Sequence, residues 1–209
     1  MSYNGPPPAP LVHADIEKLQ ADLSSARSLL IIDHPFFGAA TAKRDIIFST
    51  AVPIAAISAT GQIYINPETC RCYPLTGKPL TIRNLMWLLA HEAFHYMLGH
   101  AFRLMWRNHA AFNIAADKVI NDFLKHMRVG DPILGTLQLD GARHSSAEEL
   151  YDPADEDEDE PWDGPVTKGT VGTGGNGPPC DEPPCNSRLF RDIGNAPDDD
   201  TLTEGEVNT

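Results

Sequence analysis

The stretch that most constrains this chain is the apolar run Leu88–Met97, which contains the pattern His-Glu-x-x-His. On an α-helix, residues four apart lie about 40° apart around the axis and about 6 Å apart along it. His91 and His95 can therefore direct their imidazoles at one point, as two ligands of a single Zn²⁺ must. Glu92 lies off the histidine stripe, where its carboxylate can accept a proton from water at the metal. The run thus predicts a metal site on a buried helix.

The same pattern has a plainer interpretation, because short motifs of this kind occur by chance. In that interpretation His91 and His95 are surface histidines or hydrogen-bonded core histidines of an amphipathic helix. The residues between them, Ala93 and Phe94, are uncharged, whereas an exposed helix face normally includes Lys and Glu. Buried imidazole and carboxylate groups need partners, and a metal ion supplies one for all of them. The sequence therefore favours the metal site.

A catalytic zinc site usually has three protein ligands, so a third residue is needed. On a continuous helix His100 would face away from His95, and His109 would lie about 21 Å further along the axis. Neither can reach the site unless Gly99 breaks the helix. The better candidate is Asp117, which lies in a second predicted helix.

The second helix carries a polar stripe on a largely apolar sequence, with Asn113, Asp117 and Asn121 at intervals of four residues. If this helix folds back antiparallel to the first, Asp117 faces the histidine pair. Asn121 can then orient one histidine from outside the ligand set. The alternative is that the acids of this helix are solvated, which we expect of Asp122 but not of Asp117.

These residues carry a resemblance to a known family. The runs 90–100 and 112–121, with the flanking segments 35–38, 63–67 and 146–151, resemble the putative metallopeptidase domain of bacteria and phages over roughly residues 20 to 151. The resemblance implies a mainly helical α+β, zincin-like fold with an active-site helix, a facing second helix and a small β-hairpin or sheet. It also implies that His91, His95 and Asp117 are the metal ligands and that Glu92 is the base.

In that family the domain often precedes a von Willebrand A-like domain. No such domain follows residue 151 in this sequence. We therefore expect a stand-alone phage version of the domain, or a separately encoded von Willebrand A-like or ATPase partner.

The chain is expected to have three parts: a flexible segment at 1–12, the metallopeptidase-like domain at 13–151 and a tail at 152–209. The tail contains sixteen of the 29 acidic residues but only three of the 16 lysines and arginines. It is acidic and rich in Pro and Gly, a composition typical of disorder. Residues 1–151 are electroneutral, which argues against nucleic-acid binding, since that requires a basic surface.

The start of the chain is Pro-rich and lacks the basic and apolar regions of a signal peptide, and no apolar run is long enough to span a membrane. We therefore expect a cytoplasmic protein, in a bacterium or in the host of a phage. Cys70 and Cys72, like Cys180 and Cys185, have spacings that a second metal site could use, but free thiols are the favoured interpretation.

Periodicity predicts a helix from His13 to about Ile32, and leaves 36–49 open between helix and extended chain. Two short β segments are expected at 52–58 and 62–66, joined by a turn at Thr60-Gly61. The zincin resemblance makes residues 63–66 the candidate edge strand for a bound peptide, and a plain core hairpin is the alternative. An active-site helix is expected from Thr81 to about Trp106, and a last helical turn at 147–151. The zincin resemblance makes His144 or Tyr151 a candidate to stabilise an oxyanion, but ordinary surface residues are the favoured interpretation of both.

The function favoured by the sequence is zinc-dependent hydrolysis of a peptide bond in a protein or peptide substrate, with Glu92 as general base. The alternative is a non-catalytic, metal-stabilised phage interaction protein that acts through its acidic tail. A helical domain without metal is a third possibility, but it leaves the Asn113, Asp117 and Asn121 stripe unexplained. Glu92 favours the enzyme, because a purely structural site has little need of a carboxylate that does not bind the metal.

Overall fold

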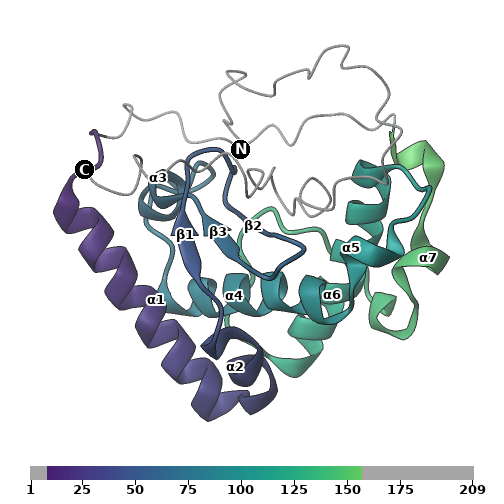
Figure 1. Cartoon of the computed structure of the whole chain (residues 1–209), viewed down its shortest axis with the longest axis horizontal. Helices are drawn as coiled ribbons and strands as arrows, with labels where there is room; N and C mark the ends of the chain where they lie inside the picture. Colours follow the sequence, from purple (N-terminus) through teal and green to yellow (C-terminus); the bar gives the residue numbers. More distant parts are fainter. Residues whose placement is uncertain (1–8, 157–209) are drawn as a thin grey trace.

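The computed structural model describes residues 9–156 and has seven α-helices, two short 3₁₀ turns and a three-stranded sheet in that part of the chain (Figure 1). The helices are α1 His13–Asp33, α2 Pro35–Ala42, α3 Pro67–Arg71, α4 Ile82–Met97, α5 His100–Arg103, α6 His109–Met127 and α7 Ala147–Leu150. The strands are β1 Ile46–Phe48, β2 Ala55–Ile57 and β3 Ile63–Ile65, and the 3₁₀ turns are Ala142–His144 and Pro153–Glu156. The predicted mainly helical α+β fold is confirmed.

The sheet has the strand order β1-β3-β2. β3 pairs in parallel with β1, where Tyr64 is opposite Ile47, and antiparallel with β2, where Tyr64 is opposite Ala56. The prediction that residues 63–66 form an edge strand is therefore wrong, because β3 is the central strand and both of its sides are already hydrogen-bonded. A peptide could add to this sheet only at β1 or β2.

The first helix, α1, follows the predicted pattern closely. Its buried residues Leu19, Leu23, Ala26 and Leu30 recur at intervals of three and four and face the rest of the core. The helix ends before Pro35, as expected. The stretch that periodicity left open divides into two elements: α2, which doubles back against α1, and the strand β1.

Helix α4 is the centre of the domain, and its residues from Leu85 to His95 are all buried. The hydroxyl of Thr81 accepts a hydrogen bond from the backbone N–H of Asn84 at 3.1 Å, which confirms the predicted N-cap. The sheet packs on this helix, as do α1 and α2 (Figure 1). A helix that is buried along most of its length requires cover on all sides, and these elements provide it together with α6.

The predicted end of the active-site helix near Trp106 is wrong, because α4 stops at Met97. Gly99 has φ of +63°, in the left-handed region that interrupts an α-helix and that favours glycine. The chain then turns into the short helix α5, which begins at His100. Because of this break, the side chain of His100 does not point in the direction that it would have if α4 continued through residue 100.

Helix α6 packs antiparallel to α4. Asn108 caps its start, accepting a hydrogen bond from the backbone N–H of Ala110 at 2.7 Å. At its other end Arg83, near the start of α4, donates to Asp131 at 2.9 Å and to the carbonyl oxygen of Gly130 at 3.0 Å. The end of α6 therefore lies beside the start of α4, which is the antiparallel arrangement that the assignment of Asp117 required.

The segment after α6 is attached to it by an ion pair between buried Asp122 and partly exposed Arg143. Asp122 is buried, and its carboxylate accepts hydrogen bonds at 3.0 Å from the backbone and at 2.9 Å from the guanidinium of Arg143. Burial raises the pKa of Asp122, but these hydrogen bonds and the charge of Arg143 outweigh it and lower the pKa overall. The expectation that Asp122 is a solvated acid is wrong, because the 3₁₀ turn at Ala142–His144 covers it.

The last described elements return to α5 and α6. A salt bridge joins Arg103 to Glu148 on α7, and the hydrogen bond from Arg103 is the main reason that the pKa of Glu148 is lowered. The predicted final helical turn is confirmed as α7. The expected tail 152–209 lies outside the described residues except for its first five residues, of which Asp155 pairs with Lys118 at 3.2 Å.

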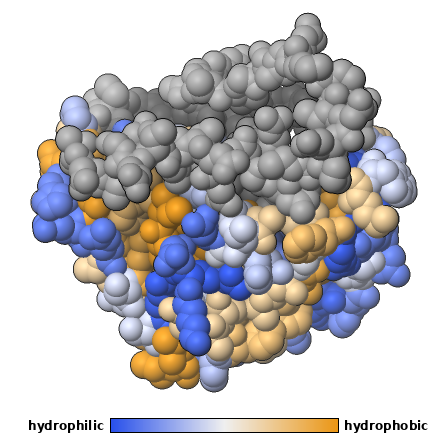
Figure 2. All heavy atoms as spheres, viewed as in Figure 1, coloured by the Kyte–Doolittle hydropathy of each residue, from blue (hydrophilic) through white to orange (hydrophobic). Residues whose placement is uncertain are grey.

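The described surface has an apolar corner where α1 meets α2. Ile31, Ile32 and Phe36 are 50%, 72% and 58% exposed there, and hydrophobic residues gather at the lower edge of Figure 2, over the same two helices.

None of the helices between residues 9 and 156 is long and apolar enough to cross a membrane. Cys70 and Cys72 are free thiols, as predicted, and burial raises the pKa of Cys70 to about 12; Cys180 and Cys185 lie outside the described residues.

Gly130 is expected to be sensitive to substitution, because it has φ of +60° and an added Cβ would lie 2.3 Å from the carbonyl oxygen of Arg83. Gly141 has φ of +88° with nothing within 4 Å of such a Cβ, so it isolates the backbone effect. Gly141→Ala should lower the free energy of unfolding by about 1–2 kcal/mol. Gly130→Ala should cost about 1–3 kcal/mol more because of the added overlap. Urea unfolding measures both, and equal costs would contradict the close approach of the turn at Gly130 to the start of α4.

The Asp122–Arg143 pair should make stability depend on pH. The pKa of Asp122 is lower in the folded state than in the unfolded state, so the unfolded state binds more protons at pH values between the two. The stabilisation that the ion pair provides is therefore fully present above the unfolded pKa and is lost as the pH falls through the folded pKa. Asp122→Asn should cost about 1.5–3 kcal/mol at pH 7, and the difference from wild type should shrink as the pH falls below 3.8, the ordinary pKa of the carboxyl group. Asp140→Asn, whose side chain is 87% exposed, is the control, and a pH-independent difference at Asp122 would contradict the pairing.

Candidate metal centre

His91 and His95 lie one turn apart on α4 and converge as their spacing predicts. Their Nε2 atoms are 3.1 Å apart, and both side chains are buried. The convergence of the two imidazoles follows from helical spacing alone, because residues four apart lie on one face of an α-helix. The buried setting follows from the apolar residues that surround them on α4.

Asp117 reaches the histidine pair from the facing helix α6. Its Oδ1 atom is 3.1 Å from Nε2 of His95 and 3.6 Å from Nε2 of His91. It lies in the buried middle of α6, between Ala116 and the half-buried Lys118. The structure thus brings together two imidazoles and one carboxylate from two helices, a buried group that could hold a metal ion.

The spacing of these three atoms fits a metal ion. A tetrahedral zinc centre with bonds of about 2.0–2.1 Å separates its ligand atoms by about 3.3–3.4 Å. The three observed separations, 3.1, 3.1 and 3.6 Å, lie on both sides of that value. The donor set also fits, since two neutral imidazoles and a carboxylate suit zinc and other first-row metals.

Asn121 lies behind His91, on the side away from the ligand atoms. Its Oδ1 atom is 2.9 Å from Nδ1 of His91, and its amide nitrogen donates to the carbonyl oxygen of Leu137 at 3.0 Å. The second bond identifies the oxygen as the atom that faces the histidine. Asn121 therefore accepts the Nδ1 proton of His91, which leaves the lone pair of Nε2 available to a metal ion.

His100 holds the corresponding place behind His95, and the sequence did not assign it there. Its Nδ1 atom is 3.0 Å from Nδ1 of His95, and its side chain is buried. The prediction that His100 faces away assumed a continuous helix, and Gly99 breaks that helix. The signal was present in the sequence as a glycine between the two histidines, but a glycine by itself does not say in which direction the chain turns.

Glu92 is fully buried beside His91 on α4. Asn113 is only partly buried one turn before Asp117, and no hydrogen bond joins it to either histidine in the part of the chain described. His144 is exposed, and Tyr151 accepts a hydrogen bond at 3.1 Å from the backbone N–H of Asn108 at the start of α6.

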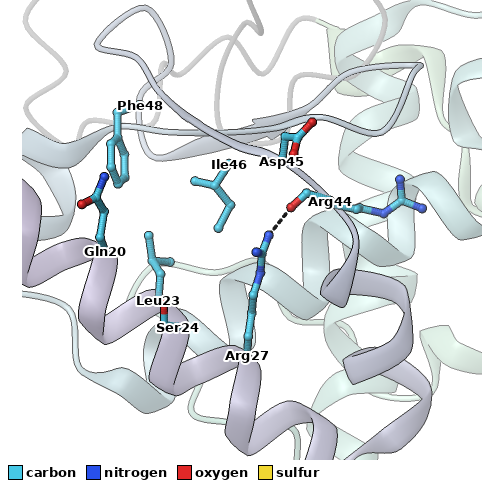
Figure 3. Close-up of a pocket in the computed structure, with 8 residues that line it drawn as sticks. All are labelled: Gln20, Leu23, Ser24, Arg27, Arg44, Asp45, Ile46 and Phe48. Atoms are coloured by element: carbon cyan, nitrogen blue, oxygen red, sulfur yellow. Dashed lines mark hydrogen bonds between the residues drawn. The ribbon is translucent and has the colours of Figure 1, made fainter. Parts of the chain in front are cut away.

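A separate surface pocket lies between α1 and β1 (Figure 3). Arg27 of α1 donates to the backbone oxygen of Arg44 across it. Burial lowers the pKa of Arg27, and the nearby charge of Asp45 opposes that shift. The lining is Gln20, Leu23, Ser24, Arg27, Arg44, Asp45, Ile46 and Phe48. It includes no residue of α4 or α6, so the pocket is distinct from the candidate metal centre.

A comparison with protein families bears on this site. A family model described as a putative metallopeptidase domain matches residues 18–169, a range that includes α4, α6 and all the side chains of the centre. The match confirms the resemblance drawn from the two helical runs. No curated protein and no solved structure was found to match the chain.

Removal of one ligand should abolish metal binding. We expect one zinc ion per chain in protein purified without chelator, and loss of that zinc in Asp117→Ala, because two imidazoles alone make an incomplete site. Asp140→Ala removes an acid that is exposed on the surface and should retain the zinc. Elemental analysis measures the content. Well-folded wild-type protein without zinc, or with iron in its place, would contradict the expectation.

Proposed function

The chain belongs to the putative metallopeptidase domain family, and on this premise we propose that it hydrolyses peptide bonds with a zinc ion held by His91, His95 and Asp117. The observation that carries the proposal is the spacing of three buried ligand atoms, from two helices, close to that of a tetrahedral zinc centre. When bound, zinc supplies a Lewis acid that polarises a carbonyl oxygen and makes a water molecule more acidic.

Each protein group has a distinct task in this proposal. His91 and His95 would present neutral Nε2 atoms to the metal, and Asp117 would offset one of the two positive charges of Zn²⁺. Asn121 holds the ring of His91 in place through Nδ1 at 2.9 Å. Because all these side chains are buried, their interactions act in a low-dielectric environment, where they are stronger than in water.

Glu92 is the proposed general base. It follows His91 directly, so it lies about 100° around the helix from that residue and off the stripe of ligands. Its carboxylate takes one proton from the attacking water as the water oxygen bonds to the carbonyl carbon. It then transfers that proton to the leaving nitrogen as the carbon–nitrogen bond breaks. The burial of Glu92 supports a role within the site rather than at the surface.

The proposed substrate is a protein or a peptide, and the proposed compartment is the cytoplasm of a bacterium or of a phage host. The first 151 residues are electroneutral, which supports a substrate other than nucleic acid. The proposed partner is a von Willebrand A-like or ATPase protein. The rival is an interaction protein in which the same metal only stabilises the fold.

Replacement of the base separates the enzyme from that rival. Glu92→Gln keeps the shape of the side chain but removes its ability to accept a proton, so cleavage of a mixed library of quenched fluorogenic peptides should fall by about 10²–10⁴-fold. Zinc content should not change, because Glu92 is not a ligand. Glu17→Gln, an exposed change on α1, serves as the control. Wild-type cleavage rates in Glu92→Gln would sink the assignment, and a zinc-loaded wild type that cleaves no peptide would favour the interaction protein.

A further inference from the structure

We infer that His100 is a positioning residue for His95, with a role like that of Asn121 for His91. The inference rests on the proposed function, since it requires that His95 bind a metal. It concerns a residue outside the ligand set and outside the His-Glu-x-x-His pattern. It predicts that the centre depends on two outer contacts, one behind each histidine.

The contact is specific in its atoms. Nδ1 of His100 meets Nδ1 of His95 at 3.0 Å, whereas Nε2 of His95 faces Asp117 at 3.1 Å. The two nitrogens of the His95 ring are thus engaged on opposite sides, one by His100 and one by the ligand group. His100 lies behind the centre, and the arrangement is that of an outer contact rather than of a fourth ligand.

Proton positions follow from this geometry. An imidazole that binds a metal through Nε2 carries its proton on Nδ1. His95 therefore donates from Nδ1, and Nδ1 of His100 must accept with its lone pair. His100 is then the neutral tautomer with its proton on Nε2. The same requirement at His91 is met by the carbonyl oxygen of Asn121, whose orientation is set by its bond to Leu137.

The fold holds His100 rigidly enough for such a task. The left-handed backbone of Gly99 ends α4 and turns His100 back toward it. The His100 ring packs edge-on against Phe112 of α6, with centroids 5.9 Å apart and planes at 86°. Both helices that supply the ligands therefore also fix His100, so that its acceptor nitrogen is held before a metal binds.

The test compares Zn²⁺ affinity of full-length variants by competition with a chromogenic chelator. His100→Leu removes the acceptor and should weaken binding by about 10–100-fold, as loss of an outer partner does. His100→Asn offers a carbonyl oxygen near the place of Nδ1, and should recover most of that loss. Asn121→Leu should resemble His100→Leu. His126→Leu changes an exposed histidine near the end of α6 and should leave the affinity unchanged.

The outcomes separate the alternatives. Equal affinity in His100→Leu and wild type would overturn the inference while leaving the proposed function intact. A loss as complete as in Asp117→Ala, with no recovery in His100→Asn, would make His100 a direct ligand and also overturn it. No Zn²⁺ binding in wild type would overturn the proposed function, and this inference with it.

A second measurement needs no variant and so does not depend on variants that fold. Two-bond ¹H–¹⁵N correlation spectra of the Zn²⁺-loaded wild-type chain report which ring nitrogen of each histidine carries the proton. We expect the proton on Nδ1 of His95 and on Nε2 of His100. A proton on Nδ1 of His100 would make that atom a donor and would overturn the inference.

Discussion

The antiparallel contact between α4 and α6 is the interaction on which the rest of the structure depends. One helix supplies two imidazoles and the other a carboxylate, and their ligand atoms lie 3.1–3.6 Å apart only because the two helices pack face to face. Burying such groups is costly unless they are paired or bind a cation. The surrounding elements can be understood as cover and support for this polar group in an apolar core.

Support comes at both ends of the helix pair. At one end Gly99 stops α4, and α5 leads the chain back to the start of α6. At the other end Arg83 binds the turn at Gly130 and Asp131. The segment after that turn supplies the carbonyl oxygen of Leu137 to Asn121 and is attached through Arg143 to Asp122. The Arg143–Asp122 contact, which touches neither histidine, therefore helps to hold the segment that orients Asn121, and through it His91.

The small sheet and the N-terminal helices act differently. They cover α4 with apolar side chains and contribute no ligand atom to the centre. Because β3 is central, the outer strands of the sheet in the described residues are β1 and β2 rather than the strand that the sequence favoured. The surface pocket lies between α1 and β1 and is separate from the candidate metal centre.

The sequence by itself determined the elements that depend on local spacing. The four-residue interval of His91 and His95, the stripe of Asp117 and Asn121, and the period of α1 all follow from 3.6 residues per turn, and the structure places them as that period requires. Tertiary structure decided what depends on partners far along the chain or on the direction of a break. Asp122 is buried because Arg143 covers it, β3 is central because β1 pairs with its other side, and His100 meets His95 because Gly99 turns the chain. Helical periodicity describes a residue's direction only while the helix continues, and it contains no information about the chain that packs against it.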